Sequence, residues 1–190
     1  MSLAVKKIYL ASKSPRRKEL LQLMGLDYEL FLKEVDESFP SDLSLDQVAA
    51  YIANKKADAF EPQADGIIIT ADTVVVLGNE ILGKPVDRAD AIQMLEKLNG
   101  NMHLVITGVS LKTAEETISF SDTTEVYFKK LSSADIEFYV DKYEPYDKAG
   151  SYGIQEWIGL VAIEKIVGSY TNVMGLPTEK LYDKLRPYLS

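Results

Sequence analysis

The chain has 190 residues, and its apolar fraction of 46% is enough to bury the core of one large domain or of two closely packed lobes. It contains no cysteine and one histidine, which excludes disulfides, thiolate zinc sites, cysteine nucleophiles and histidine-rich metal sites. The net charge of −8 argues against general attraction to a nucleic-acid backbone. No apolar run reaches the roughly 20 residues that span a bilayer, and no signal-peptide pattern is present, so we expect a cytoplasmic protein.

The first half of the chain alternates strand-like and helix-like patterns. In chain order we predict a strand over 8–11, a helix over 16–24, an amphipathic helix over 43–60, a strand over 67–77 that turns at Gly78-Asn79 into 80–82, and a helix over 87–98. Asp87 caps the last of these helices, and Asn99-Gly100 ends it. This order is typical of strand-helix units that pack on a sheet.

The second half contains a long hairpin. Residues 104–112 and 117–128 alternate apolar and polar side chains, as half-buried antiparallel strands do. In chain order there follow a helix over 133–142, a glycine-containing loop over 147–153, a strand over 160–166 and a helix over 177–188. This mixture predicts an α/β fold in which helices flank a mixed β-sheet. No repeat or linker divides the chain, so we expect a single domain over 1–190.

The segment 12–18, with the sequence SKSPRRK, starts a helix with an unfavourable charge. A serine cap and a proline at the first helical position suit a helix start. Arg16, Arg17 and Lys18 follow, although the N-terminus of a helix carries partial positive charge and favours anions. A phosphate chain would offset this repulsion and would bind backbone N–H groups, hydroxyls and guanidinium groups together. The alternative is a solvated basic turn.

Asp72 interrupts the apolar run over 67–77. Burial of an unpaired carboxylate is costly, so Asp72 should lie at a strand end or bulge, meet a cation, or bind a metal. Each of these arrangements is typical of an active site. The alternative is that the strand ends at Ala71 and that Asp72 caps a turn.

Lys56 is predicted to point inward. At 100° per residue it lies about 1100° from Leu45, which places it within about 20° of the apolar stripe of its helix. An inward lysine beside a cleft can neutralise phosphate, but it can also run along the edge of the core with its ammonium in water. Lys55 lies on the flank of the same helix and is expected to be solvated.

Four further positions carry weaker signals. Lys84 lies on a constrained Gly-Lys-Pro loop, and Glu37 belongs to an acidic pair that could be solvated or bind a metal. Gln155 follows a glycine loop and could read a base or face solvent. For His103 we expect a surface position or a satisfied hydrogen bond. Because sulfur and most imidazole ligands are excluded, any metal should be a hard cation such as Mg²⁺ or Mn²⁺.

Several separated segments together resemble the Maf family of the inosine triphosphate pyrophosphatase superfamily. In chain order they are LASKSPRR (10–17), VDE (35–37), ADT (71–73), GKP (83–85), DKAGSYGIQ (147–155) and NVMGLP (172–177). They span nearly the whole chain and lie in the family's order. A Walker loop and a G-x-G-x-x-G motif are both missing from the sequence, so the two common nucleotide folds have no support.

The resemblance implies two lobes around a deep cleft, an often homodimeric protein, and hydrolysis between the α- and β-phosphates of a nucleoside triphosphate. It assigns triphosphate binding to Ser12, Arg16 and Arg17, phosphate contacts to Lys56 and Lys84, and metal binding to Glu37. It makes Asp72 the proton acceptor and links Arg16, Thr73 and Gln155 with substrate choice.

The Tyr-Gly-Ile-Gln form of the glycine loop resembles the branch of the family that acts on dTTP and UTP. The amide of Gln155 offers one acceptor and one donor, which match N3–H and a carbonyl of uracil or thymine, although a flipped amide could serve cytosine.

In the mechanism that we expect, a divalent cation bound by Asp72 and Glu37 lowers the pKa of the attacking water, and pyrophosphate leaves. The family is also associated with arrest of septum formation, so the alternative is a nucleotide-binding regulator of cell division with little hydrolytic activity.

Overall fold

A computed structural model describes residues 6–189. Its strands are β1 (Lys7–Leu10), β2 (Tyr28–Leu30), β3 (Gly66–Leu77), β4 (Glu80–Leu82), β5 (Met102–Lys112), β6 (Thr117–Phe128) and β7 (Ile163–Val167). Its α-helices are α1 (Pro15–Leu23), α2 (Leu45–Asp58), α3 (Arg88–Leu98), α4 (Ser133–Tyr143), α5 (Trp157–Val161), α6 (Tyr170–Met174) and α7 (Thr178–Leu185), and two short 3-10 helices are η1 (Ala149–Ser151) and η2 (Arg186–Tyr188).

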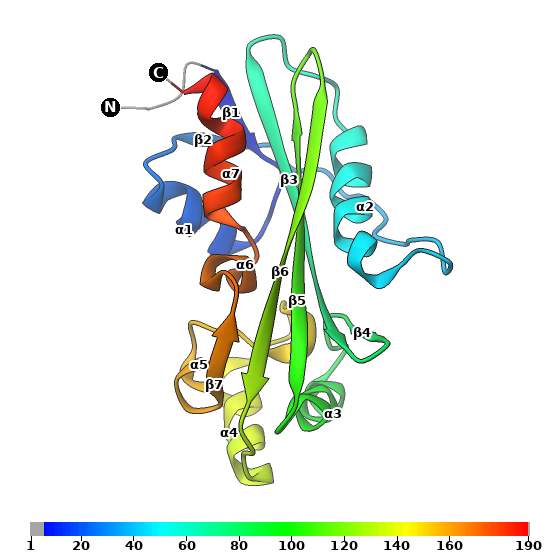
Figure 1. Ribbon diagram of the computed structural model, residues 1–190, viewed down its shortest axis with the longest axis vertical. Coiled ribbons are helices and arrows are strands. Elements are labelled where there is room, and N and C mark those ends of the chain that lie inside the picture. Colours follow the sequence, from blue (N-terminus) through cyan, green and yellow to red (C-terminus); the bar gives the residue numbers. More distant parts are fainter. Residues whose placement is uncertain (1–5, 190) are drawn as a thin grey trace. The chain divides into compact units, whose positions relative to one another are not determined.

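The strands form a seven-stranded mixed sheet in the order β2-β1-β3-β5-β6-β7, and β4 pairs with β3 (Figure 1). β1 runs parallel to both β2 and β3, whereas β3–β4 and β6–β7 are antiparallel pairs. The predicted fold class, a mixed sheet flanked by helices, is therefore confirmed. None of the helices within residues 6–189 is long and apolar enough to cross a membrane.

The chain divides into two compact units. The first runs to Asp72 and includes Thr107–Asp122 and the segment from Gly175 onward, and the second comprises Thr73–Ile106 and Thr123–Met174. Strands β3, β5 and β6 contribute residues to both units. The deep cleft and the single domain over 1–190 stay predictions.

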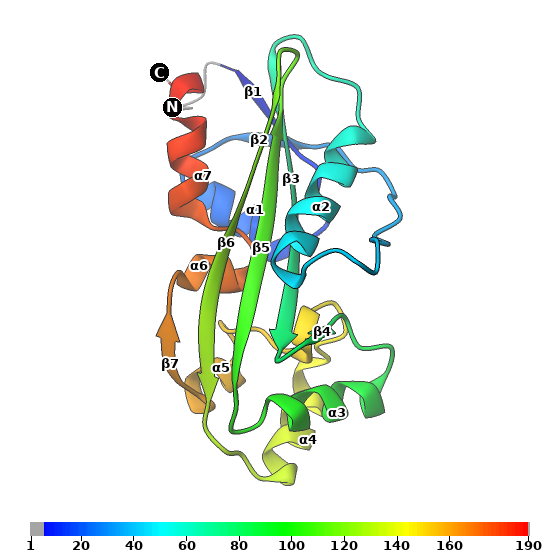
Figure 2. The same cartoon turned by 45° about the vertical axis from the view of Figure 1, so that its right-hand side comes forward.

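The first unit carries helices on both faces of its part of the sheet. In both ribbon views α2 lies on one face, and α1 and α7 lie on the other (Figures 1 and 2). The apolar stripe of α2 is buried through Val48, Ala49, Ile52, Ala53 and Ala57. Because α2 docks through this stripe, residues on its edge, such as Lys56, are directed toward β3.

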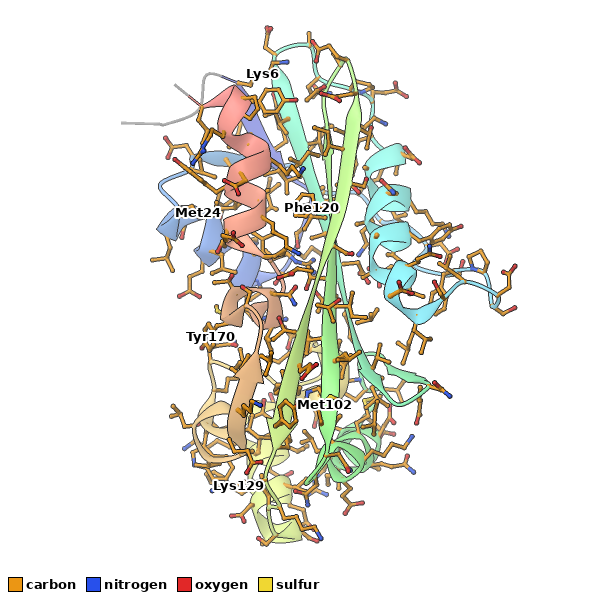
Figure 3. The ribbon with its side chains drawn as sticks, viewed as in Figure 1. Lys6, Met24, Met102, Phe120, Lys129 and Tyr170 are labelled. Carbon is orange, nitrogen blue, oxygen red and sulfur yellow. The ribbon has the colours of Figure 1, made fainter. Side chains whose placement is uncertain are left out.

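Surface contacts join the start and the end of the described chain to the turn between β5 and β6. Lys6, labelled in Figure 3, forms an ion pair at 3.2 Å with Glu115 in the turn between β5 and β6. Its ammonium also lies 5.5 Å from the ring centroid of Tyr188. The hydroxyl of Tyr188 donates a hydrogen bond to Glu116 at 3.3 Å, so η2 is attached to the same turn.

The second unit is built around the α3–α4 pair and the antiparallel pairing of β6 with β7. Arg88 at the start of α3 forms a forked ion pair with Asp141 of α4, with a distance of 2.9 Å from Nη2 to Oδ2. Asp87 caps α3 as predicted, because its side chain accepts a hydrogen bond from the N–H of Asp90 at 2.9 Å. Ser132 caps α4 through a complete capping box with Asp135.

One prediction about the elements is wrong, and one alternative is excluded. The strand predicted over 67–77 is confirmed as β3, which continues through Asp72 from Gly66 to Leu77, so the alternative that the strand ends at Ala71 fails. The strand predicted over 160–166 begins only at Ile163, and α5 takes its first part. A Cβ at Gly159 would lie 1.7 Å from the carbonyl oxygen of Ile154, so this glycine lets α5 turn against the preceding loop. The alternation of apolar and polar residues that predicts a strand does not indicate such a close contact.

Candidate active site

The start of α1 is built by two serine hydroxyls. The hydroxyl of Ser14 accepts a hydrogen bond from the N–H of Arg17 at 3.5 Å, and the hydroxyl of Ser12 accepts one from the N–H of Ser14 at 3.2 Å. Pro15 occupies the first turn, where its missing N–H costs nothing. The predicted helix start is therefore confirmed, and Ser12, 7% exposed, lies at its base.

Arg17 ties three segments of the first unit together. Its Nε donates to the carbonyl of Gly175 at 2.7 Å, and its Nη1 donates to the carbonyl of Ala71 at 2.9 Å and to the hydroxyl of Ser12 at 3.4 Å. Burial lowers the pKa of this guanidinium below its usual value of 12.5, the negative charge of Asp72 raises it, and the charge of Arg16 lowers it. The group stays charged at neutral pH.

Lys56 connects the two acids that were singled out in the sequence. Its Nζ lies 2.7 Å from Oδ1 of Asp72 and 2.7 Å from Oε1 of Glu37. The side chain of Lys56 is 15% exposed and that of Asp72 is 13% exposed, so the prediction of an inward lysine is confirmed. Of the arrangements expected for Asp72, the structure shows the meeting with a cation.

The loop that carries Glu37 is held against α2 by its neighbour. Asp36 accepts hydrogen bonds from the backbone N–H of Ser38 at 3.1 Å and from Nζ of Lys55 at 2.9 Å. Hydrogen bonds from Ser38 and then from Lys55 lower the pKa of Asp36 to about 2. Lys55 is therefore paired rather than merely solvated, and adjacent lysines of α2 bind adjacent acids of the loop.

The carboxylates of Glu37 and Asp72 are the residues that could share in holding a divalent cation. Within residues 6–189 no group of three or more histidine, cysteine, aspartate and glutamate residues could hold a metal ion. Mg²⁺ is commonly bound by one or two carboxylates together with water and the phosphates of a substrate. The two oxygen donors on either side of Lys56 fit a cation of that kind.

The second unit brings two other predicted segments together. The N–H of Gly150 donates to the carbonyl of Gly83 at 3.0 Å, which joins the loop that precedes Gln155 to the loop that carries Lys84. Gly150 has φ +68° and a Cβ there would lie 2.9 Å from the side chain of Val75, so glycine is required. Lys84 and Gln155 are themselves exposed.

A partly buried network beside the same loop was not predicted from the sequence. Lys148, 8% exposed, pairs with Asp147 at 2.8 Å and with Glu156 at 3.1 Å. The hydroxyl of Tyr139 donates to Glu156 and accepts a hydrogen bond from the N–H of Gly153 at 3.0 Å. The sequence does show a lysine between two acids in the segment 147–156, but this pattern does not indicate that the lysine is buried.

The predicted site residues thus fall into two groups. Those of the first unit lie in one cluster of cations and acids, namely Ser12, Arg16, Arg17, Glu37, Lys56 and Asp72. Thr73 follows Asp72 along β3 and belongs to the second unit with Lys84 and Gln155. The chemical roles assigned to all of these residues stay predictions.

The chain is similar in sequence to one known protein family over nearly its whole length. The family described as Maf-like protein matches residues 7–188. A dTTP/UTP pyrophosphatase of Flavobacterium psychrophilum is 52% identical over 178 residues, which cover 93% of this chain and 91% of that protein. A dTTP/UTP pyrophosphatase of Bacteroides thetaiotaomicron is 50% identical over 182 residues, 94% of each chain. Among solved structures, a HAM1 protein of Coxiella burnetii covers 96% of this chain and 99% of its own, with 16% identity and a TM-score of 0.49.

Proposed function

The chain belongs to the Maf family, and from this we propose that it is a nucleoside triphosphate pyrophosphatase that hydrolyses dTTP and UTP to the nucleoside monophosphate and pyrophosphate. The named relatives support the reaction and its pyrimidine substrates, because about half of their residues are identical over nearly the whole chain. Modified pyrimidine nucleotides are further candidate substrates. The observation that carries the proposal is the cluster in which Arg17, Lys56, Glu37 and Asp72 converge.

The cluster has the charges that this reaction needs. Water attacks the α-phosphorus, the bond to the bridging oxygen breaks, and pyrophosphate leaves with its negative charge. Arg16, Arg17, Lys56 and Lys84 would neutralise that charge, and Ser12 would hold a phosphate oxygen at the start of α1.

Asp72 would accept the proton of the attacking water. Its carboxylate is largely buried and projects from the continuous strand β3, so the strand holds it in a fixed position, as a general base requires. A divalent cation such as Mg²⁺ or Mn²⁺, bound with Glu37 and Asp72, would supply Lewis acidity and lower the pKa of that water. Thr73 and Gln155 would contact the nucleoside and select the base.

Release of pyrophosphate tests the proposal directly. The protein is incubated with UTP or dTTP and Mg²⁺, and pyrophosphate and the monophosphate are quantified in equal amounts. In Asp72→Asn the amide keeps the shape but cannot accept the proton, so turnover should fall by about a hundredfold or more. Full activity of Asp72→Asn would remove Asp72 from its role.

The alternative, a nucleotide-binding regulator of septum formation, predicts a different outcome of the same assay. If the protein is a regulator, UTP should bind and raise the melting temperature of the protein, but no pyrophosphate should be released. We also propose that the protein acts in the cytoplasm, where its nucleotide substrates are found. We further propose a homodimer, which sedimentation of the purified chain would test.

A further inference from the structure

Lys56 occupies the place between two carboxylates that a divalent cation would need. Its ammonium nitrogen is 2.7 Å from an oxygen of Glu37 and 2.7 Å from an oxygen of Asp72. Those two oxygens therefore already share one cation, the ammonium group of Lys56. With 15% of the Lys56 side chain and 13% of the Asp72 side chain exposed, the bulk solvent screens this contact only weakly.

An ammonium group and a divalent ion compete for these two oxygens. A divalent ion such as Mg²⁺ must approach carboxylate oxygens to about 2.1 Å, and a positive charge already in contact with the same oxygens repels it. For the metal to bind, the Lys56 ammonium has to leave both acids. Because a partly buried charge is costly without a partner, its departure requires another anion nearby.

The phosphates of the nucleotide are the anion that could receive Lys56. Resting on the proposed function, we infer that Lys56 couples metal binding to nucleotide binding. Without nucleotide it neutralises Glu37 and Asp72 and weakens their affinity for a metal. With nucleotide it moves to a phosphate oxygen and leaves both carboxylates to the metal.

Lys56 is better suited to exchange partners than its neighbours Arg17 and Lys55. Arg17 binds the backbone carbonyls of Gly175 and Ala71 through a rigid planar group, and Lys55 holds the carbonyl of Ser38 as well as Asp36. Lys56, by contrast, holds two side-chain carboxylates with a compact charge on a flexible stem. Glu37, whose side chain is 46% exposed, lies where metal and phosphate can reach it.

The inference predicts synergy between the two ligands. If nucleotide raises the affinity for metal by some factor, metal raises the affinity for nucleotide by the same factor, because the two equilibria form a closed cycle. Removal of the Lys56 charge should tighten the binding of metal alone and reduce this factor. An ordinary structural lysine would change neither quantity in that direction.

The test measures binding rather than turnover. Mn²⁺ is titrated into the whole protein and free Mn²⁺ is followed by electron paramagnetic resonance, with and without α,β-methylene-UTP, which cannot be cleaved between those phosphates. In Lys56→Gln we expect Mn²⁺ alone to bind about tenfold tighter or more than in the wild type, since one opposing charge is gone. The factor by which the nucleotide raises the affinity for Mn²⁺ should be correspondingly smaller in this variant.

Lys112→Gln is the matched control. The side chain of Lys112 is 14% exposed, almost the same as that of Lys56, but it donates to the carbonyl of Ala57 at 3.2 Å and faces Asp58. Its removal takes one similar charge from the same unit and should leave both Mn²⁺ affinities at wild-type values. Complexes of Mn²⁺ with free nucleotide form in the nucleotide-containing samples of every variant, and a titration without protein measures their contribution.

Two results would overturn the inference. In the first, Mn²⁺ alone binds no tighter to Lys56→Gln than to Lys112→Gln. In the second, the nucleotide raises the Mn²⁺ affinity of Lys56→Gln by as large a factor as in the wild type. If Lys56→Gln does not fold, Lys56→Arg tests the inference instead. A forked guanidinium should hold both acids more firmly, so the Lys56→Arg protein should bind Mn²⁺ alone several-fold more weakly than the wild type. Pyrophosphate release by the wild type tests the enzyme activity separately, so either idea can fail without the other.

Discussion

Gly108 of β5 lies against the backbone of Ala49 in α2. A Cβ on Gly108 would be 2.3 Å from the carbonyl carbon of Ala49 and 2.3 Å from the nitrogen of Ala50, well inside van der Waals contact. The helix can approach the strand this closely only because residue 108 has no side chain. Lys56 lies two turns further along the same helix, so this contact sets how near Lys56 comes to Asp72.

Gly108→Ala should therefore destabilise the protein and displace the lysine. We expect the free energy of unfolding in urea to fall by about 3 kcal/mol, because backbone atoms cannot move aside as a side-chain tip can. Gly83→Ala is the control, since a Cβ there would meet nothing within 4 Å. Equal stability of the two variants would show that α2 adjusts freely on its strand.

Gln155→Glu should change the preference for the base. A carboxylate can accept two hydrogen bonds but donate none, so the pair with N3–H and a carbonyl of uracil is lost. We expect kcat/KM for UTP to fall by about tenfold to a hundredfold, a range that corresponds to one bidentate base contact. The measurement is pyrophosphate release from UTP, dTTP and CTP. An unchanged UTP to CTP ratio would remove Gln155 from base recognition.

Tyr139→Phe should loosen the loop that precedes Gln155. The substitution leaves the N–H of Gly153 without its acceptor and removes one donor from Glu156, which keeps Lys148, at a cost of roughly 1–3 kcal/mol in the free energy of unfolding. If the loop positions the base, KM for UTP should rise more than kcat falls.

The control for Tyr139→Phe is Tyr143→Phe. The ring of Tyr143 stacks on that of Tyr139 with centroids 5.1 Å apart, so the substitution tests loss of a neighbouring hydroxyl in the same packing. We expect KM to stay near the wild-type value. A rise in KM that is the same in both variants would point to general loosening of α4 instead of a specific role for the loop contact.

His103 should make the protein sensitive to mild acid. Its side chain is 1% exposed among the rings of Phe128 and Tyr152, and burial lowers its pKa from 6.5 to about 4. As the pH falls from 6.5 to 4, the unfolded chain takes up a proton that the folded protein does not. The free energy of unfolding should therefore decrease over this window, by roughly 3 kcal/mol at most.

The check is the slope of the unfolding free energy against pH in wild type and in His103→Gln, which cannot titrate. The slope between pH 6.5 and 4.5 should nearly vanish in the variant, even if the variant is less stable at every pH. Asp36, whose pKa is about 2, responds below this window and does not confuse the comparison. Parallel slopes would mean that His103 is solvated when protonated.

His103 also marks a limit of the sequence reading. A surface or satisfied histidine was expected, and the structure shows a buried ring that is satisfied at one nitrogen, with Nε2 2.7 Å from the hydroxyl of Tyr152 and with Nδ1 lacking a hydrogen-bond partner among residues 6–189. Tyr152 is 49 residues away in the chain. Contacts of that kind depend on how strands and loops pack, which local periodicity does not record.

Most of the longer elements, and the charged residues that are unusual within them, could be predicted from the sequence alone. Helix caps and apolar periods are local, so Asp87, the hairpin of β5 and β6, and the inward direction of Lys56 could be read directly. The carboxylate of Asp72 in an apolar run indicated a partner of opposite charge, because an unpaired buried charge is unstable.

The partners of these residues became evident only from the packing of the folded chain. The pairing of Lys56 with both Glu37 and Asp72, and of Tyr139 with Gly153 and Glu156, joins segments that are remote in the chain. Such pairs form where packing brings side chains within hydrogen-bond distance. A strand or helix pattern carries no information about that distance, since it describes one segment at a time.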